Sequence, residues 1–269
     1  MLPEALGLPE LTPAERVGLL HWIGDSVFTA LTAGQLKYGF CRAYAVGDPN
    51  APEMAVVRGA VEPTEPTAFG TDVRALWSLL SRIPGWDCVN VESGFEREVA
   101  SFLEQKLGFP ARIVSERFYS LERDPSRFSA PEVRRLTPMD LPAVEGSDPL
   151  FHSFFIGHGD PARTLAEGVV AGVISGGKLV SAITTSAWSG VHVDLGAATL
   201  PEARRRGLAT AAACLVCSEL RAVGLKPVWA AGEPNVASWR VPEKLGFRFA
   251  GRKEYVVFDG LRPSGFWPR

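Results

Sequence analysis

Three consecutive arginines and a glycine occupy positions 204–207, between a strand-like run and an Ala-rich run. The guanidinium group of arginine offers a positive charge and a planar fork of donors to phosphate oxygens. The first turn of a helix leaves backbone N–H groups unpaired beside a positive dipole, and Gly207 would let an anion approach that backbone closely. The stretch therefore predicts a phosphate or pyrophosphate site at the start of a helix.

An exposed turn that binds nothing is the alternative for the same four residues, because arginine is usually solvated at protein surfaces. The spacing G-x-x-x-x-G-K-[ST] of a P-loop is absent, and so is the G-x-G-x-x-G of a dinucleotide-binding turn. On these residues alone, both the anion site and the plain turn remain open.

Two motifs together resemble the GNAT superfamily of N-acyltransferases. Arg204, Gly207 and Ala209 match R-x-x-G-x-A, the acetyl-CoA pyrophosphate loop of that family. After one further strand-like run, NVASWRVPEKLGF is similar to the family stretch N-x-x-S/A-x-x-x-Y-x-K-x-G-F. The matching residues of this second motif are Asn235, Ser238, Lys244, Gly246 and Phe247. The resemblance covers roughly residues 133–258.

The resemblance implies acetyl-CoA as cosubstrate and no metal. Backbone groups of the predicted strand that precedes the arginine-rich turn would pair with the pantetheine arm. One N–H of that strand would polarise the thioester carbonyl. The side chain of Asn235 would bind the same arm, or would only cap its helix. The residues implied at the cofactor site are Ala197, Ala198, Thr199, Arg204, Arg205, Arg206, Gly207, Leu208, Ala209, Thr210 and Asn235.

The reaction implied is direct transfer of an acetyl group to a primary amine of a small molecule within a ternary complex. An alkyl ammonium must lose a proton before it can attack, so a base is needed. The family often places a carboxylate on the fourth strand. The corresponding position in this chain is Val193, between His192 and Asp194. Because side chains alternate along a strand, His192 and Asp194 share one face and Val193 lies on the other, so a bulge would decide which of them acts as the base. We favour Asp194, with His192 and Glu233 as alternatives.

One position departs from the family pattern. The tyrosine that often protonates the leaving thiolate is replaced by Pro242, which has no proton to donate. Ser238 and Tyr255 are the candidates to assist instead. The departure favours one alternative to acetyl transfer, a non-catalytic acyl-CoA-binding or sensor protein. A transferase of a longer acyl chain is a second alternative.

The elements that would hold these residues read as an α+β fold in the second half of the chain. Turns are expected at Gly176–Gly177 and Ser189–Gly190, both between strand-like runs. The predicted helices lie at 138–144, 207–221 and after Asn235, and the predicted strands at 168–174, 178–188, 192–199, 227–231, 247–250 and 254–258. Three antiparallel strands followed by alternating helices and strands predict a mixed, mostly antiparallel sheet flanked by helices.

The first half repeats part of this order. Its predicted strands lie at 37–45, 55–61, 88–91 and 113–121, and its predicted helices at 73–82 and 95–106. KLGF occurs in both halves, and an offset of 138 residues separates Phe109 from Phe247. We therefore predict a duplication, with a degenerate GNAT-like domain at 1–125, a linker at 122–132 and an acetyl-CoA-binding GNAT domain at 126–269.

Only the second domain is expected to bind the coenzyme. The stretch EPTEPTAFG, which matches the arginine-rich turn in the first half, carries two glutamates and no arginine. Such a loop would repel a pyrophosphate. The tandem arrangement with one active domain resembles that of several GNAT relatives.

Composition limits the partners. The formal net charge is −2, which gives no bulk attraction to nucleic acid or to an anionic membrane. Four cysteines do not suggest a disulfide framework, and Cys214 and Cys217 share one face of an apolar helix. No secretory signal or membrane-spanning run is recognisable, so a cytoplasmic location is expected. A homodimer stays open.

Overall fold

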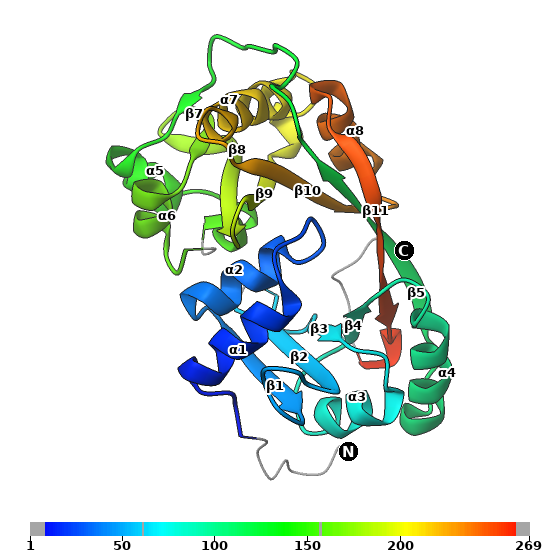
Figure 1. Cartoon of the computed structure of the whole chain (residues 1–269). Coiled ribbons are helices and arrows are strands. Elements are labelled where there is room, and N and C mark those ends of the chain that lie inside the picture. The colour runs from blue at the N-terminus through cyan, green and yellow to red at the C-terminus, as the bar shows by residue number, and fades with distance from the viewer. Residues whose placement is uncertain (1–8, 61, 156–157, 262–269) are drawn as a thin grey trace. The chain divides into compact units, whose positions relative to one another are not determined.

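The computed structural model describes residues 9–60, 62–155 and 158–261. These residues form two compact units: unit 1 takes them from 1–24, 41–116 and 252–269, and unit 2 takes them from 25–40 and 117–251. Strands flanked by helices are visible in each unit (Figure 1). Among the described residues, no helix combines the length and apolar character needed to cross a bilayer.

Unit 1 is built on the sheet order β1-β2-β3-β4-β11-β5. Its strands are β1 (Cys41–Val46), β2 (Met54–Gly59), β3 (Thr67–Phe69), β4 (Cys88–Val91) and parts of β5 (Arg112–Ser120) and β11 (Arg248–Val257). Its helices are α1 (Pro13–Ile23), α3 (Val73–Leu80), α4 (Glu96–Leu107) and the short η4 (Asp259–Leu261). Leu76 of α3 and Leu103 of α4 are fully buried in one core with Val256 of β11.

Unit 2 has the sheet order β11-β5-β10-β9-β8-β7-β6. Its strands, besides parts of β5 and β11, are β6 (Arg134–Arg135), β7 (Val170–Ser175), β8 (Lys178–Trp188), β9 (His192–Thr199) and β10 (Lys226–Gly232). Its helices are α2 (Ala30–Tyr38), η1 (Pro138–Asp140), α5 (Leu141–Glu145), η2 (Pro149–Phe155), α6 (Pro161–Glu167), η3 (Pro201–Ala203), α7 (Leu208–Ala222) and α8 (Val236–Leu245). The sheet is mostly antiparallel, with β9 and β10 parallel.

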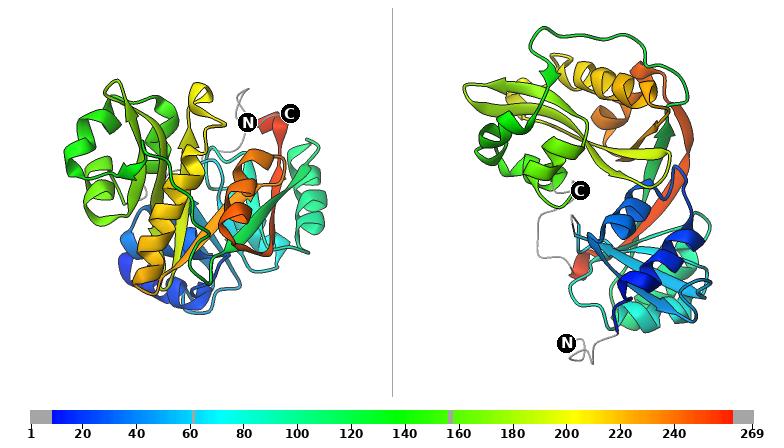
Figure 2. Two further views of the ribbon diagram at one scale, coloured as in Figure 1. Left: turned by 90° about the horizontal axis from the view of Figure 1, so that it is seen from above. Right: turned by 60° about the vertical axis from the view of Figure 1, so that its left-hand side comes forward.

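The two faces of the unit 2 sheet are covered by different helices. Val193 and Leu195 of β9 pack against α7 in one apolar cluster, which also buries Cys214 and Cys217. Ala198 of β9 instead packs with the aromatic residues of η2. Because side chains alternate along a strand, the even-numbered residues of β9 face η2. Figures 1 and 2 show α7, in gold, lying across the strands of this sheet.

Strands β5 and β11 each contribute residues to both units, because the unit boundaries follow Glu116 and Gly251. In unit 1, residues 254–257 of β11 pair antiparallel with residues 88–91 of β4. In unit 2, the N–H of Leu121, just after β5, donates to the carbonyl of Pro227 in β10 at 3.0 Å. The functional division at 125/126 stays a prediction, while each compact unit takes segments from both sides of it.

The element order supports the predicted duplication. In the first half α3, β4, α4 and β5 follow one another, and in the second half α7, β10, α8 and β11 do so. The start of β4 at Cys88 and the start of β10 at Lys226 are separated by the same offset as Phe109 and Phe247. The predicted α+β class, with mixed and mostly antiparallel sheets flanked by helices, is confirmed.

Two predictions about elements were wrong. The run 37–45 is not one strand, because α2 extends to Tyr38 and Gly39 ends it in the left-handed conformation, with φ +77. The runs 247–250 and 254–258 are not two strands, because β11 continues through them. Gly251 makes this continuity feasible: its φ is +149, and a Cβ there would lie 2.9 Å from Phe28 Cζ.

Candidate active site

A cavity of about 460 Å³ lies in unit 2 beside the first turn of α7. Its walls come from the end of β9, the turn into α7, one residue of β10 and one face of α8. The lining residues are Ala197, Ala198, Thr199, Ala203, Arg204, Arg205, Gly207, Leu208, Ala209, Thr210, Trp229, Asn235, Ala237, Ser238, Arg240, Val241 and Lys244. Every residue predicted for the cofactor site lines this cavity except Arg206.

The cavity lies where β9 and β10 stop pairing. Their parallel pairing runs only from His192 opposite Lys226 to Asp194 opposite Val228. The other edge of β9 stays paired with β8 as far as Thr199. Beyond Asp194, backbone groups on one edge of β9 are therefore available to a ligand, and Ala197–Thr199 line the cavity at this point.

The first turn of α7 has no side-chain cap. Gly207 holds the N-cap position in the left-handed conformation, with φ +77, and no side chain caps the helix there. Apart from the adjoining residues and the backbone of the helix itself, no heavy atom lies within 4 Å of the position that a Cβ of Gly207 would occupy. Arg205 is also left-handed, with φ +63. The N–H groups of this turn and the positive end of the helix dipole therefore face the cavity without a competing carboxylate or hydroxyl.

The corresponding helix of unit 1 starts differently. Asp72 caps α3, and its Oδ1 accepts hydrogen bonds from the backbone N–H groups of Arg74 at 2.8 Å and Ala75 at 3.0 Å. A depression beside this helix is lined partly by Glu53, Asp72 and Glu98. The donors that an anion would need are thus occupied by a carboxylate of the chain itself.

The charged side chains lining the unit 2 cavity are all cationic. Arg204 donates from its Nε to the carbonyl of Thr199 at 3.2 Å, which holds the guanidinium at the end of β9. The cations on the lining are Arg204, Arg205, Arg240 and Lys244, and the lining contains no aspartate or glutamate. Arg206 points elsewhere, since its Nη2 pairs with Glu132 at 2.9 Å.

Helix α8 presents one polar face to the cavity. The side chain of Asn235 caps the helix by accepting from the N–H of Ser238 at 3.2 Å. The hydroxyl of Ser238 accepts from Trp229 Nε1 at 3.1 Å, which leaves its own O–H free to donate. Pro242 is buried inside the helix and does not line the cavity. Ser238 is therefore the hydroxyl that α8 offers there.

Asp194 lies on the η2-facing side of β9, next to a β-bulge. The register between β8 and β9 shifts between Thr185 and Ala187, which leaves Ser186 without an opposite residue. Burial raises the pKa of the Asp194 carboxyl to about 7, and a hydrogen bond from the side chain of Ser186 acts against that rise. A carboxyl that titrates near neutral pH can accept a proton from an ammonium group.

The other two candidate bases occupy different surroundings. His192 Nδ1 lies 3.0 Å from Asp25 Oδ1 at the start of β9, and Asp25 also accepts from the N–H of Val191 at 2.8 Å. Glu233 is exposed just after β10, and its carbonyl accepts from Trp239 Nε1 at 3.2 Å. None of Asp194, His192 and Glu233 is among the residues lining the cavity. Tyr255 lies in unit 1.

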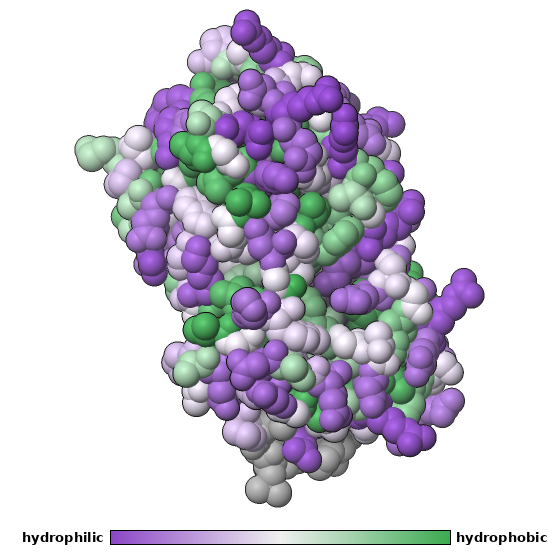
Figure 3. Space-filling view, viewed as in Figure 1, coloured by the Kyte–Doolittle hydropathy of each residue, from purple (hydrophilic) through white to green (hydrophobic). Residues whose placement is uncertain are grey.

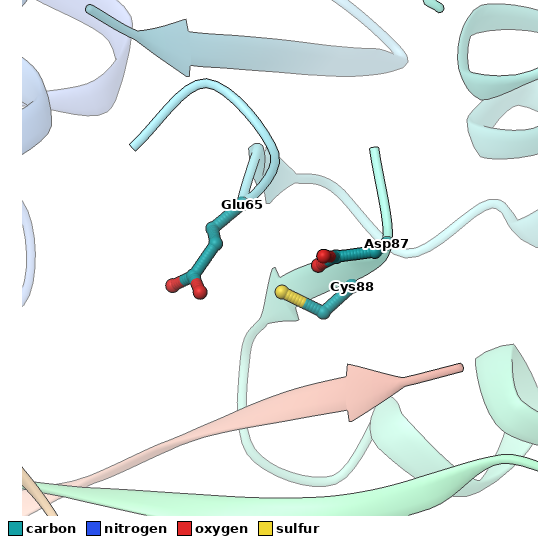
Figure 4. A group of neighbouring side chains, drawn as sticks. All are labelled: Glu65, Asp87 and Cys88. Atoms are coloured by element: carbon teal, nitrogen blue, oxygen red, sulfur yellow. The ribbon is translucent and has the colours of Figure 1, made fainter. Parts of the chain in front are cut away.

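A second cluster of chemically active side chains lies in unit 1. Glu65, on the turn before β3, and Asp87 and Cys88, at the start of β4, place potential ligand atoms within 4.8 Å of one another (Figure 4). Each of the three already takes part in an interaction within the chain. Two carboxylates and a buried thiol do not by themselves define a metal site.

Sequence reasoning missed several residues of the site. Arg240 and Lys244 stand four apart on α8, so their spacing could have placed them on one face. Ser186 could not be found in this way, because its contact with Asp194 depends on the bulge in β8. Asp25 also lies beyond such reasoning, since it is far from His192 in the sequence.

Comparison with known proteins agrees with the motifs. The family model described as GNAT acetyltransferase matches residues 143–258. No curated protein matches the chain. The matched region contains the arginine–glycine turn and α8, so the resemblance predicted from these motifs, with the family region in the C-terminal half, is confirmed.

Solved structures extend the likeness over more than nine-tenths of the chain. A Drosophila protein is 18% identical with a TM-score of 0.66 and covers 95% of this chain and 99% of its own. A GCN5-related N-acetyltransferase-like protein from Streptococcus suis is 16% identical with a TM-score of 0.62, covering 91% and 98%. A tandem GNAT protein from the clavulanic acid biosynthesis pathway is 14% identical with a TM-score of 0.55, covering 95% and 98%. At these identities, the likeness shows a tandem GNAT fold.

Proposed function

We propose that this chain, in which residues 143–258 match the family model described as GNAT acetyltransferase, is an acetyl-CoA-dependent N-acetyltransferase acting on a primary amine of a small molecule. One observation carries the proposal: the uncapped first turn of α7 faces a cavity that begins where β9 and β10 stop pairing. A coenzyme A thioester contains a diphosphate, which would bind at that turn, and an extended pantetheine arm, which would lie along β9.

Acetyl-CoA would bind through three sets of groups. The backbone N–H groups after Gly207 would hold the pyrophosphate, with Arg204 and Arg205 supplying positive charge. The free edge of β9 over Ala197–Thr199 would pair with the pantetheine amides as a further strand does. The amide of Asn235 would donate to the same arm while its oxygen caps α8.

The transfer itself would use Asp194 as the base and Ser238 to help protonate the leaving group. The ionised carboxylate of Asp194 takes a proton from the ammonium of the acceptor, and the free amine attacks the thioester carbonyl carbon. A β9 backbone N–H stabilises the developing oxyanion. The C–N bond forms and the C–S bond breaks. The second proton of the nitrogen passes through the Ser238 hydroxyl, as a relay, to the departing thiolate, and Asp194 returns the first proton to solvent.

The experiment that tests the proposal is a thiol-release assay with acetyl-CoA and a panel of small primary amines. Free CoA thiol is expected to appear only when protein, acetyl-CoA and an accepted amine are all present, together with an equal amount of the N-acetyl product. Absence of CoA binding in a parallel titration would refute the assignment.

A second candidate is a protein that binds acyl-CoA without turning it over. The observation that favours it is the buried proline at position 242, where relatives of the family often carry a proton donor. Tight CoA binding without thiol release across the amine panel would identify this function. Titration with thioesters of increasing acyl length, in the same assay, separates acetyl transfer from transfer of a longer acyl group.

A further inference from the structure

The cavity carries more positive charge than a diphosphate needs. Its four cations lie in two sets: Arg204 and Arg205 at the turn into α7, and Arg240 and Lys244 on α8. The first set lies with the free amides of α7 and matches the two charges of a diphosphate diester. The second set lies on another wall and is left without an anion.

The α8 pair has no partner within the part of the chain that the structure describes. Neither side chain takes part in a described ion pair or hydrogen bond, whereas Arg206 pairs with Glu132 at 2.9 Å and Lys226 with Glu122 at 3.3 Å. The neighbouring carboxylate of Glu243 is engaged with the hydroxyl of Tyr119 at 3.4 Å.

The spacing of this exposed pair is mildly unfavourable without an anion. Residues four apart lie on the same helix face, and two like charges there destabilise a helix by about 0.2–0.5 kcal/mol. Arg240 and Lys244 hold this arrangement in a helix that already contains Pro242. An anion bound between them would remove the repulsion and supply charge-assisted hydrogen bonds.

We propose that Arg240 and Lys244 form a second anion subsite that recognises the 3′-phosphate of coenzyme A. The inference rests on the proposed function, since it places the nucleotide end of the same ligand. A phosphomonoester carries about −1.5 to −2 charges at pH 7, which matches two cations. The diphosphate at α7 and the monoester at α8 together balance the four positive charges of the cavity.

The test compares coenzyme A with 3′-dephospho-CoA, which lacks only this phosphate, by isothermal titration of the full chain. The unaltered protein is expected to bind CoA about ten-fold or more tightly than dephospho-CoA. R240Q, K244Q and the double variant are expected to weaken CoA binding and to leave the affinity for dephospho-CoA unchanged, so that the preference disappears in the double variant.

Two further variants control the interpretation. R240K keeps the charge and is expected to retain most of the preference. R248Q removes an exposed cation outside the cavity and is expected to retain all of it. Equal affinity of the unaltered protein for both ligands would overturn the subsite while leaving the proposed function standing. Binding of neither ligand would overturn the proposed function itself.

Discussion

Asp194 combines deep burial with a pKa near neutrality, a combination suited to a general base. The residue is 8% exposed, and the pKa of its carboxyl lies near 7 because burial disfavours the charged form. The value of kcat/KM for the amine substrate is expected to rise as the pH passes through about 7 in the unaltered protein. In D194N this rising limb should be lost and kcat should fall by about 10²–10⁴-fold, with little change in acetyl-CoA affinity. A D194N variant with unaltered rates would move the base to His192 or Glu233.

The same carboxyl links stability to pH. Its folded-state pKa is raised, so the folded state favours the neutral form, and this contribution to stability is lost as pH rises through about 7. The melting temperature of the unaltered protein should therefore fall, relative to that of D194N, which stays neutral, as the pH rises from about 4 to about 7. Each kcal/mol corresponds to about 2–4 °C in a chain of this size. Parallel melting curves over that range would contradict a buried, titrating Asp194.

Arg204 and Arg206 form a matched pair of variants. Arg204 lines the cavity and is held by the carbonyl of Thr199, whereas Arg206 is paired with Glu132. R204A should weaken CoA binding by roughly 1.5–3 kcal/mol, the value of a hydrogen bond to a charged group. R206A should have a much smaller effect in the same titration. Equal losses in both variants would mean that general charge, and not the position of the guanidinium, attracts the coenzyme.

At the scale of the element, the contrast between α7 and α3 can be tested by one substitution. G207D would place a carboxylate where Asp72 stands in α3, and aspartate tolerates the left-handed conformation better than most residues. It would cap the free amides and repel the diphosphate, so CoA affinity should fall at least about ten-fold. G207N has the same shape without the charge, and its loss should be clearly smaller. A G207D protein that binds CoA normally would place the pyrophosphate elsewhere.

Elements whose ends are marked by turn residues were predictable from sequence. The predicted limits of β8 and β9 match the structure because Gly176–Gly177 and Ser189–Gly190 end the strands locally. Helix α2 was missed because its interior Gly34 argues against a helix. The structure explains that glycine, since a Cβ at Gly34 would lie 2.5 Å from Ala187 Cβ of β8. Tertiary contact, which local pattern does not contain, overrides propensity there.

The residues of the candidate site likewise divide into those that local sequence predicts and those that it does not. The turn at Gly207 and the N-cap Asn235 follow from local backbone requirements, and both line the cavity. The bulge at Ser186 and the contact of Asp25 with His192 arise only when distant segments come together. The sequence therefore predicted the residues of the proposed coenzyme site more completely than the residues that surround the proposed base.

At the scale of the whole molecule, a duplication in which one domain is degenerate predicts a single coenzyme site per chain. Unit 2 offers free amides and four cations, whereas α3 in unit 1 is capped by Asp72 beside further carboxylates. Titration should give a stoichiometry of one CoA for each chain, and D72N should leave it at one. Two equivalents of CoA bound by the unaltered chain would contradict the assignment of unit 1 as degenerate.

Figure 3 shows polar side chains, in purple, spread over the face it displays, with apolar residues scattered between them. The formal net charge of −2 gives no bulk attraction to polyanions. The positive charge that matters is local to the unit 2 cavity.

The pairing of β11 with β4 in unit 1 has a consequence for folding during synthesis on the ribosome. Strand β4 is translated early and lies between β3 and β11, of which β11 is translated late. Ser93, just after β4, hydrogen-bonds to the carbonyl of Arg252, 159 residues further on. Until that late segment leaves the exit tunnel, the nascent chain carries β4 with one edge bare. Such edges invite mispairing, so we expect unit 1 to complete its sheet only after the last residues of unit 2 have been synthesised.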